Sequence, residues 1–149
     1  MKKVSSELLL LDLNVLLAIA WPNHQFHAAV RRRLEPSTDR WATCALTQLG
    51  FIRLSSNQAA VGSPATPAQA AAVLAVMTSD PLHVYLGNLP SPVGRKGRPA
   101  FTNILGSKQV TDAYLLKLAH WHRARFVTFD SRLKGLAGPE TPIEILGGL

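Results

Sequence analysis

Three aspartates in this chain stand where an apolar segment begins or ends. Asp12 and Asp130 each follow a short apolar run, and Asp112 immediately precedes another. An ionised carboxylate beside a hydrophobic core costs free energy unless a partner compensates its charge. The placement of three such groups therefore indicates a shared cation or a site of proton transfer.

Carboxylate oxygens are hard ligands of the kind that Mg²⁺ or Mn²⁺ prefers, and these ions keep several waters that phosphate oxygens can replace. A phosphodiester bound at such a site would have an oxygen polarised, and a water could attack it in line. The alternative is that the aspartates only cap helices, since carboxylates near a helix N-terminus are favoured. Helix capping is a reasonable explanation for any one of these aspartates. It is a weaker explanation for the occurrence of all three.

The rest of the sequence offers few competing sites. The lone cysteine, Cys44, permits no internal disulfide and is expected to be a small buried side chain. His120 and His122 would diverge on one helix, and the His-Glu-x-x-His pattern of zinc hydrolases is missing from the sequence. So are the glycine-rich motifs that cradle nucleotide phosphates. Zinc hydrolases and nucleotide-cofactor enzymes are therefore disfavoured.

Length and composition predict a single domain over residues 1–149. The chain is 47% hydrophobic and 17% charged, which allows a sizeable core. Its 16 Lys and Arg exceed its 9 Asp and Glu, and the net charge of +7 favours a polyanionic partner, although a basic solvated surface is the simpler alternative. No apolar run approaches the length of a membrane span, and the first residues lack the pattern of a secretory signal. We expect a cytoplasmic protein without membrane contact.

Hydrophobic periodicity predicts strands that alternate with helices. Short apolar runs predict strands over Leu8–Leu13, Trp41–Thr43, Leu82–Leu86, Phe126–Phe129 and Ile143–Leu146. Apolar residues at helical spacing predict helices near residues 26–34, 45–55, 67–77 and 107–123. Such an alternation is typical of an α/β fold with a central parallel sheet that helices cover on both faces.

Two of these helices carry further local predictions. A stripe of Ala45, Leu49 and Ile52 is expected to face the core. Thr66 and Gln69 have the spacing of a capping box, which should begin the next helix. Both details follow from side-chain spacing alone.

The predicted sheet also places the aspartates. Ligands of parallel α/β folds bind beyond the carboxyl ends of the strands, where Asp12 and Asp130 are expected. On the helix near residues 107–123, Asp112 shares a face with Leu115 and Ala119, so its carboxylate should lean toward the core. The three carboxylates are therefore expected to point at one spot.

A long irregular segment, Gly87–Gly106, precedes the helix that carries Asp112. It gathers Arg95, Lys96 and Arg98 among glycines and prolines, which is typical of a mobile basic loop. Such a loop would bring positive charge close to the carboxylates. A merely disordered insertion explains the composition equally well.

Four segments of the chain, in order, resemble the PIN-domain ribonucleases of the VapC toxin family. They are Leu11–Leu17, Thr43–Arg53, Lys108–Leu116 and Val127–Asp130. Each segment alone is a weak signature, but the four together span nearly the whole chain. The resemblance implies a three-layer α/β/α sandwich and Mg²⁺-dependent cleavage of RNA. It also implies a toxin of a type II toxin-antitoxin system, with a cognate antitoxin, a homodimer, and transfer RNA (tRNA) as one candidate substrate.

Carried over by position, the resemblance makes Asp12 and Asp112 the principal metal ligands and Asp130 the third acid of the cluster. The residues expected to orient these acids are Asn14, Thr111 and Thr128.

Gln48 stands where the family often has a glutamate. An amide offers one neutral oxygen and cannot take a proton from water at neutral pH, so the site loses one negative charge. We expect Gln48 to take part in catalysis by orienting a metal-bound water or the scissile phosphate. The alternative is a helix residue with no role in the chemistry.

The leading hypothesis is a metal-dependent endoribonuclease that uses Mg²⁺ or Mn²⁺ on Asp12, Asp112 and Asp130. RNA phosphates would be bound by basic side chains, namely Arg53, Arg95, Lys96 and Arg98. The alternative is a catalytically weakened protein that binds RNA or a partner without efficient cleavage. A phosphatase of the haloacid-dehalogenase type is disfavoured, because Asn14 stands where its second aspartate would be.

Overall fold

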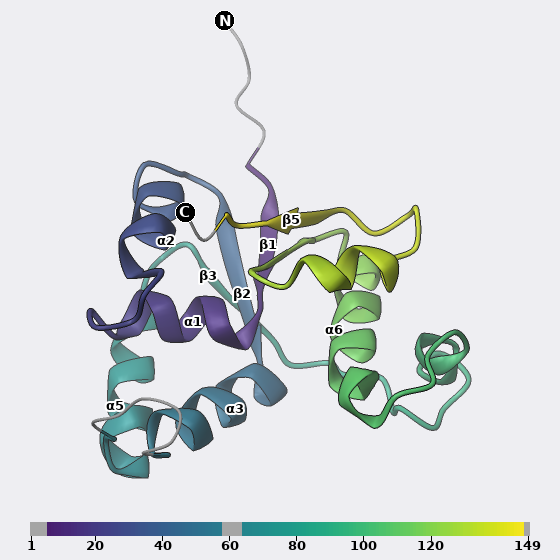
Figure 1. Cartoon of the computed structure of the whole chain (residues 1–149), viewed down its shortest axis with the longest axis horizontal. Coiled ribbons are helices and arrows are strands. Elements are labelled where there is room, and N and C mark those ends of the chain that lie inside the picture. The colour runs from purple at the N-terminus through teal and green to yellow at the C-terminus, as the bar shows by residue number, and fades with distance from the viewer. Residues whose placement is uncertain (1–5, 58–63, 148–149) are drawn as a thin grey trace, which may run out of the picture.

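The chain folds around a five-stranded parallel sheet that lies between two layers of helices (Figure 1). A computed structural model describes residues 6–57 and 64–147. The strands, in the spatial order β3-β2-β1-β4-β5, are β1 (Leu8–Leu11), β2 (Arg40–Cys44), β3 (His83–Leu86), β4 (Arg125–Thr128) and β5 (Ile143–Ile145). The helices of the described residues are α1 (Leu13–Ala20), α2 (His27–Leu34), α3 (Ala45–Ser55), α5 (Pro67–Met77) and α6 (Val110–Trp121). Three short 3-10 turns are η1 (Arg98–Phe101), η2 (Ser107–Gln109) and η3 (Ser131–Gly135). This arrangement confirms the predicted three-layer α/β fold.

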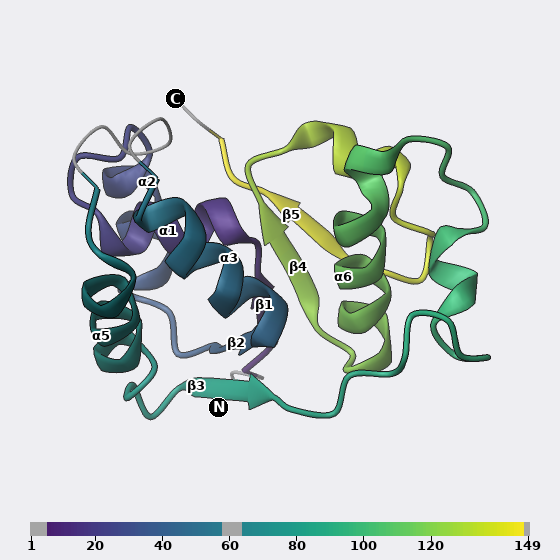
Figure 2. The ribbon, with the colours of Figure 1, turned by 90° about the horizontal axis from the view of Figure 1, so that it is seen from below.

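Different helices pack on the two faces of the sheet. Leu9 and Leu11 of β1 lie in one core with residues of α1, α2, α3 and α5, whereas Leu10 lies in a second core with residues of α6. This is the period of two that a strand imposes on its side chains. Figure 2 shows α6 on one side of the sheet and α1, α3 and α5 on the other. Asp12, two residues after Leu10, therefore continues the α6 face beyond the carboxyl end of β1.

The first strand is shorter than predicted, because the chain turns into a helix directly after Asp12. The strand was expected to reach Leu13, but β1 ends at Leu11 and α1 begins at Leu13. The sequence did not predict α1, whose residues Val15–Ala18 are all buried. A short helix without a polar face has no periodic signal that separates it from a buried strand.

The helix α3 buries a different face from the predicted one. Leu49 of the predicted stripe is 65% exposed. The buried side chains lie at four-residue spacing and are Thr47, Phe51 and Ser55. Phe51 stacks on the indole of Trp21, whose N–H donates to Ser55 Oγ at 2.9 Å. The buried face of α3 is thus the one that carries Phe51 against Trp21, and the predicted stripe with Leu49 is not buried.

The remaining predicted strands and helices are present, with ends that differ by a few residues. The capping box is confirmed, because Thr66 Oγ1 accepts the N–H of Gln69 at 3.1 Å and the Gln69 side chain accepts the N–H of Thr66 at 2.9 Å. The segment Gly87–Gly106 is irregular apart from η1, which packs against α6. No helix within the described ranges is long and apolar enough to cross a membrane. The prediction that the first residues do not form a secretory signal concerns residues that lie partly outside those ranges.

Candidate active site

Asp12 lies beyond the carboxyl end of β1, and hydrogen bonds hold its carboxylate from two sides. One oxygen accepts the N–H of Leu13 at 2.7 Å, and the other accepts the hydroxyl of Thr128 at 2.6 Å. The residue is only 7% exposed. Burial raises the pKa of Asp12 above its usual value, although both hydrogen bonds oppose that rise. Asp12 is therefore a fixed carboxylate that forms no ion pair within the described part of the chain.

Asp112 brings a second carboxylate to the same face from the first turn of α6. Its side chain is half-buried, and Leu115, one turn further along the same face of α6, is buried, as the helical spacing predicted. Its pKa is raised to about 6, first by burial and then by the negative charges of Asp12 and Asp130. A carboxyl whose pKa is raised by burial and by neighbouring carboxylates is typical of functional sites. Asp12 and Asp112 thus form a concentration of negative charge between β1 and α6.

Asp130, by contrast, is paired with a cation of the same chain. It caps the N-terminus of η3, and its carboxylate oxygens accept hydrogen bonds from the Arg132 guanidinium at 2.9 and 2.8 Å. These bonds lower the pKa of Asp130 below its usual value. The sequence did not single out Arg132. The Asp-x-Arg spacing after an apolar strand is a signal that could have found it.

The three carboxylates do not converge on one spot as predicted. Among residues 6–57 and 64–147, no group of three acidic, His or Cys side chains is placed to hold a metal ion. The physical reason is that both oxygens of Asp130 are turned to Arg132. The charges of Asp12 and Asp112 are coupled, and Asp130 is coupled to both through its charge and to Asp12 also through the hydroxyl of Thr128.

Thr128, at the end of β4, joins two of the aspartates. Its hydroxyl donates to Asp12 at 2.6 Å and accepts the backbone N–H of Asp130 at 3.1 Å. The side chain is fully buried, so both bonds are shielded from water. Thr128 therefore holds Asp12 in one orientation. Asn14 and Thr111 are exposed, on α1 and α6, and their orienting role stays a prediction.

Gln48 is bound on the other face of the sheet from Asp12. Its amide nitrogen donates to Thr43 Oγ1 at 3.0 Å, and the same hydroxyl lies 2.8 Å from Nε2 of His83. Thr43 alternates with Ala42 and Cys44, which face α6, so Thr43 faces α3. The structure thus ties the amide nitrogen of Gln48 to β2 and, through Thr43, to β3. Its predicted catalytic role remains a prediction.

The predicted basic residues are spread over the surface rather than gathered at the acids. Arg53 lies in the last turn of α3 and lines, with Thr111, a groove of about 570 Å³. Arg95, Lys96 and Arg98 are all exposed. The ammonium of Lys96 lies 5.0 Å from the ring centroid of Trp121, the last residue of α6. Lys96 is therefore at the opposite end of α6 from the carboxylates, which corrects the expectation that the whole loop brings its charge to them.

The chemistry of Asp12 and Asp112 fits a divalent cation. Both offer hard oxygen donors, and the raised pKa of Asp112 reflects a charge density that a bound cation would relieve. Asp130 could join such a site only after releasing Arg132, and Gln48 offers at most a neutral oxygen. The residues present therefore fit one hard divalent ion better than two.

Comparison with known proteins places this geometry in a family. The model of the PIN domain matches residues 9–139. Ribonuclease VapC39 of Mycobacterium tuberculosis is 43% identical over 127 residues, which are 83% of this chain and 89% of that protein. Ribonuclease VapC38 of the same organism is 40% identical over 140 residues, which are 92% of this chain and 96% of that protein.

A solved structure supports the fold independently. The crystal structure of VapBC2 from Rickettsia felis bound to a DNA fragment from their promoter superposes with a TM-score of 0.60 and 12% sequence identity. The match covers 94% of this chain and 99% of that chain. The chain belongs to the PIN-domain family and, within it, to the VapC ribonucleases.

Proposed function

We propose that this protein is the toxin of a type II toxin-antitoxin system and acts as a metal-dependent endoribonuclease. The observation that carries the proposal is the pair of Asp12 and Asp112, in a PIN-domain chain, with the pKa of Asp112 raised to about 6. The named ribonucleases among its relatives support the same activity. That residues 1–149 form a single nuclease domain also stays a proposal.

Asp12 and Asp112 would hold one Mg²⁺ or Mn²⁺ ion through their carboxylate oxygens. A divalent ion held there would supply a Lewis acid beside the scissile phosphate. Thr128 keeps Asp12 in the orientation that such binding needs, because its hydroxyl is already committed to that carboxylate. The two aspartates thus form the part of the site that the fold prepares in advance.

Asp130 and Arg132 would act on the substrate as a pair. The guanidinium of Arg132 uses Nε and one Nη on Asp130 and keeps further N–H groups for a phosphate oxygen. As the phosphate takes up Arg132, the Asp130 carboxylate becomes free to orient the attacking water. The reaction adds this water across one P–O bond and leaves a phosphate on one fragment and a hydroxyl on the other. Basic side chains elsewhere, Arg53, Arg95, Lys96 and Arg98, would bind further phosphates.

A second candidate function is RNA or partner binding without efficient cleavage. Two observations favour it: Gln48 supplies no carboxylate and is bound to Thr43, and Asp130 is neutralised by Arg132. The Asp130–Arg132 pair lowers the negative charge around Asp12 and Asp112, and Gln48 adds none. A nuclease assay with and without divalent ions distinguishes the two functions.

We further propose a cognate antitoxin as partner and the cytoplasm as the place of action. The structure of VapBC2 from R. felis supports a protein partner by its fold likeness. Exposed Leu46 and Leu49 on α3 offer apolar surface for one. Homodimerisation and tRNA as the substrate stay predictions to be tested with the purified protein.

The experiment is RNA cleavage by the wild-type protein and by Asp112→Asn, with Mg²⁺ or Mn²⁺ and with a chelator. We expect metal-dependent cleavage by the wild type and a loss of roughly a hundredfold or more in the variant, because one of two ligands becomes neutral. The matched control is Asp80→Asn. Asp80 is an exposed aspartate just before β3 whose carboxylate accepts a hydrogen bond from Trp41, and this variant should cleave normally. Equal cleavage by wild type and Asp112→Asn would overturn the proposal.

A further inference from the structure

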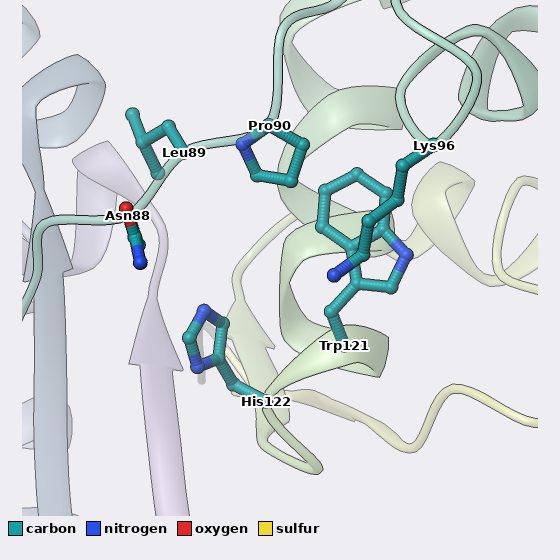
Figure 3. A pocket seen from close by; sticks show the side chains of 6 residues that line it. All are labelled: Asn88, Leu89, Pro90, Lys96, Trp121 and His122. Atoms are coloured by element: carbon teal, nitrogen blue, oxygen red, sulfur yellow. The ribbon is translucent and has the colours of Figure 1, made fainter.

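A second cavity lies between the segment that follows β3 and the carboxyl-terminal end of α6 (Figure 3). Its volume is about 350 Å³. The residues that line it are Asn88, Leu89, Pro90, Lys96, Trp121 and His122. None of these residues is acidic, and the protein as a whole carries a net charge of +7. The lining therefore favours a ligand that is neutral or anionic.

Three polar side chains from two parts of the chain, Asn88 and Lys96 of the segment Gly87–Gly106 and His122 after α6, line this cavity. Figure 3 shows the amide of Asn88 pointing toward the imidazole of His122, with the ammonium of Lys96 over the indole of Trp121. The ammonium lies 5.0 Å from the centroid of the indole, within the range of a cation–π contact. Trp121 is itself held edge-on against Tyr114, whose hydroxyl donates to the carbonyl of Pro90 at 2.6 Å. The aromatic residue thus fixes the cation at the mouth of the cavity.

These groups match the parts of one nucleotide. An imidazole ring offers a face on which a base can stack, and an amide can pair with the edge of a base. A fixed ammonium is suited to a phosphate. A cavity of this size is large enough for a base.

The position of the cavity links it to the carboxylates. Trp121 follows Asp112 by nine residues on α6, which is about 13 Å along the helix and about 2.5 turns, so the two side chains leave α6 on opposite sides. About four stacked nucleotides cover the axial distance, and a single strand that also passes around α6 from one side to the other needs more than that number. We propose that the cavity binds one unpaired nucleotide of an RNA whose scissile phosphate lies at Asp12 and Asp112, with Lys96 on its phosphate and Asn88 and His122 on its base. This inference rests on the proposed ribonuclease function.

The test measures binding rather than cleavage. Nucleoside 5′-monophosphates are titrated into the protein with tryptophan fluorescence as the readout, and a labelled single-stranded RNA is titrated into the Asp112→Asn variant by fluorescence anisotropy. We expect Lys96→Met to weaken both affinities roughly fivefold to tenfold, because it keeps the apolar stem and removes the phosphate contact. Lys117→Met removes one charge from α6 outside the cavity and should change either affinity by less than about twofold.

A second variant, Trp121→Phe, tests whether the fluorescence change arises at the cavity rather than elsewhere in the protein. Trp121→Phe keeps an aromatic ring and should abolish the nucleotide-dependent fluorescence change, since Trp21 and Trp41 lie in the other core of the protein. Melting temperatures of all variants are compared with that of the wild type. Equal loss of affinity in Lys96→Met and Lys117→Met, or no loss in either, would overturn the proposal. The binding assays need no catalysis, so their outcome is independent of whether wild type cleaves RNA.

Discussion

The candidate site has two halves that differ in how their charge is compensated. The acidic half, Asp12 and Asp112, carries two carboxylates that form no ion pair within the described residues and whose pKa values are raised. In the compensated half, Asp130 is paired with Arg132 and Gln48 is a neutral amide bound to Thr43. Only the acidic half retains charge that an external cation would relieve.

This difference indicates which residues are prepared for a metal and which await the substrate. A carboxylate that is buried and fixed by hydrogen bonds loses little freedom when it binds an ion. A carboxylate in an exposed ion pair must first give up its partner, and such pairs exchange readily because water screens them. We therefore expect metal binding to depend on the acidic half, and RNA positioning to depend on the compensated half.

Among changes that leave the two carboxylate ligands in place, the largest effect should follow from Thr128→Val, which keeps the shape of a buried side chain and removes its hydroxyl. Asp12 loses a hydrogen bond that opposes the rise of its pKa, and the N–H of Asp130 loses its acceptor. We expect metal affinity and cleavage at limiting Mn²⁺ to fall roughly tenfold to a hundredfold. The unfolding free energy should fall by about 1–3 kcal/mol.

The matched control for this variant is Thr47→Val. Thr47 is equally buried, and its hydroxyl accepts the N–H of Cys44 at 3.0 Å at the start of α3. Its loss should lower stability without changing metal affinity. If the two variants lose metal affinity equally, the special position of Thr128 is refuted.

A smaller effect is expected on stability, and it sharpens the charge difference between the halves. The pKa of Asp112 is raised from 3.8 to about 6 in the folded protein, so the folded state binds more protons than the unfolded state between these values. Wild-type stability relative to Asp112→Asn should therefore fall as the pH rises from about 4 to about 7. Above that window the variant should be more stable by about 1 kcal/mol, after allowance for solvent screening. Urea unfolding without divalent ions measures the difference.

Asp80 provides a control of opposite sign. Its carboxylate accepts hydrogen bonds from the N–H of Leu82 at 2.9 Å and from the indole of Trp41 at 3.0 Å, and these bonds lower its pKa. The contribution of Asp80 is present at neutral pH and is lost as the pH falls. Asp80→Asn should therefore be less stable than wild type at neutral pH. The same sign for both variants would contradict the charge assignment.

The smallest effect should come from Gln48→Ala. The amide of Gln48 is held by Thr43 on the α3 face, so its loss should leave Mn²⁺ affinity within about twofold of wild type. Calorimetric titration with Mn²⁺ measures this directly. A loss as large as that of Asp112→Asn would erase the distinction between the two halves and restore Gln48 to the metal site.

The sequence predicts those parts of the fold that depend on patterns of several residues. The parallel sheet, the segment 45–55 as a helix and the cap at Thr66 are all present. The helix α1 was missed because all of its residues except Asn14 are apolar, and the prediction for α3 was wrong because Phe51, rather than Leu49, is buried. The hydrophobic periodicity of a segment indicates its average burial and does not reveal individual side-chain contacts.

The same limit applies to the candidate site. The positions of Asp12 and Asp112 follow from strand ends and helix faces, which patterns capture. The pairing of Asp130 with Arg132, and that of Gln48 with Thr43, depends on side-chain rotamers in three dimensions. The basic composition of the loop Gly87–Gly106 led to the prediction that Lys96 lies beside the acids. The contact with Trp121 holds Lys96 at the other end of α6 instead.

The most direct test of the central claim is calorimetric titration of the wild-type protein and of Asp112→Asn with Mn²⁺ at neutral pH. The account predicts that the wild type binds close to one ion and that the variant binds it at least roughly tenfold more weakly. No detectable uptake by the wild type, or equal uptake by both proteins, would contradict the claim that Asp12 and Asp112 hold a metal ion together.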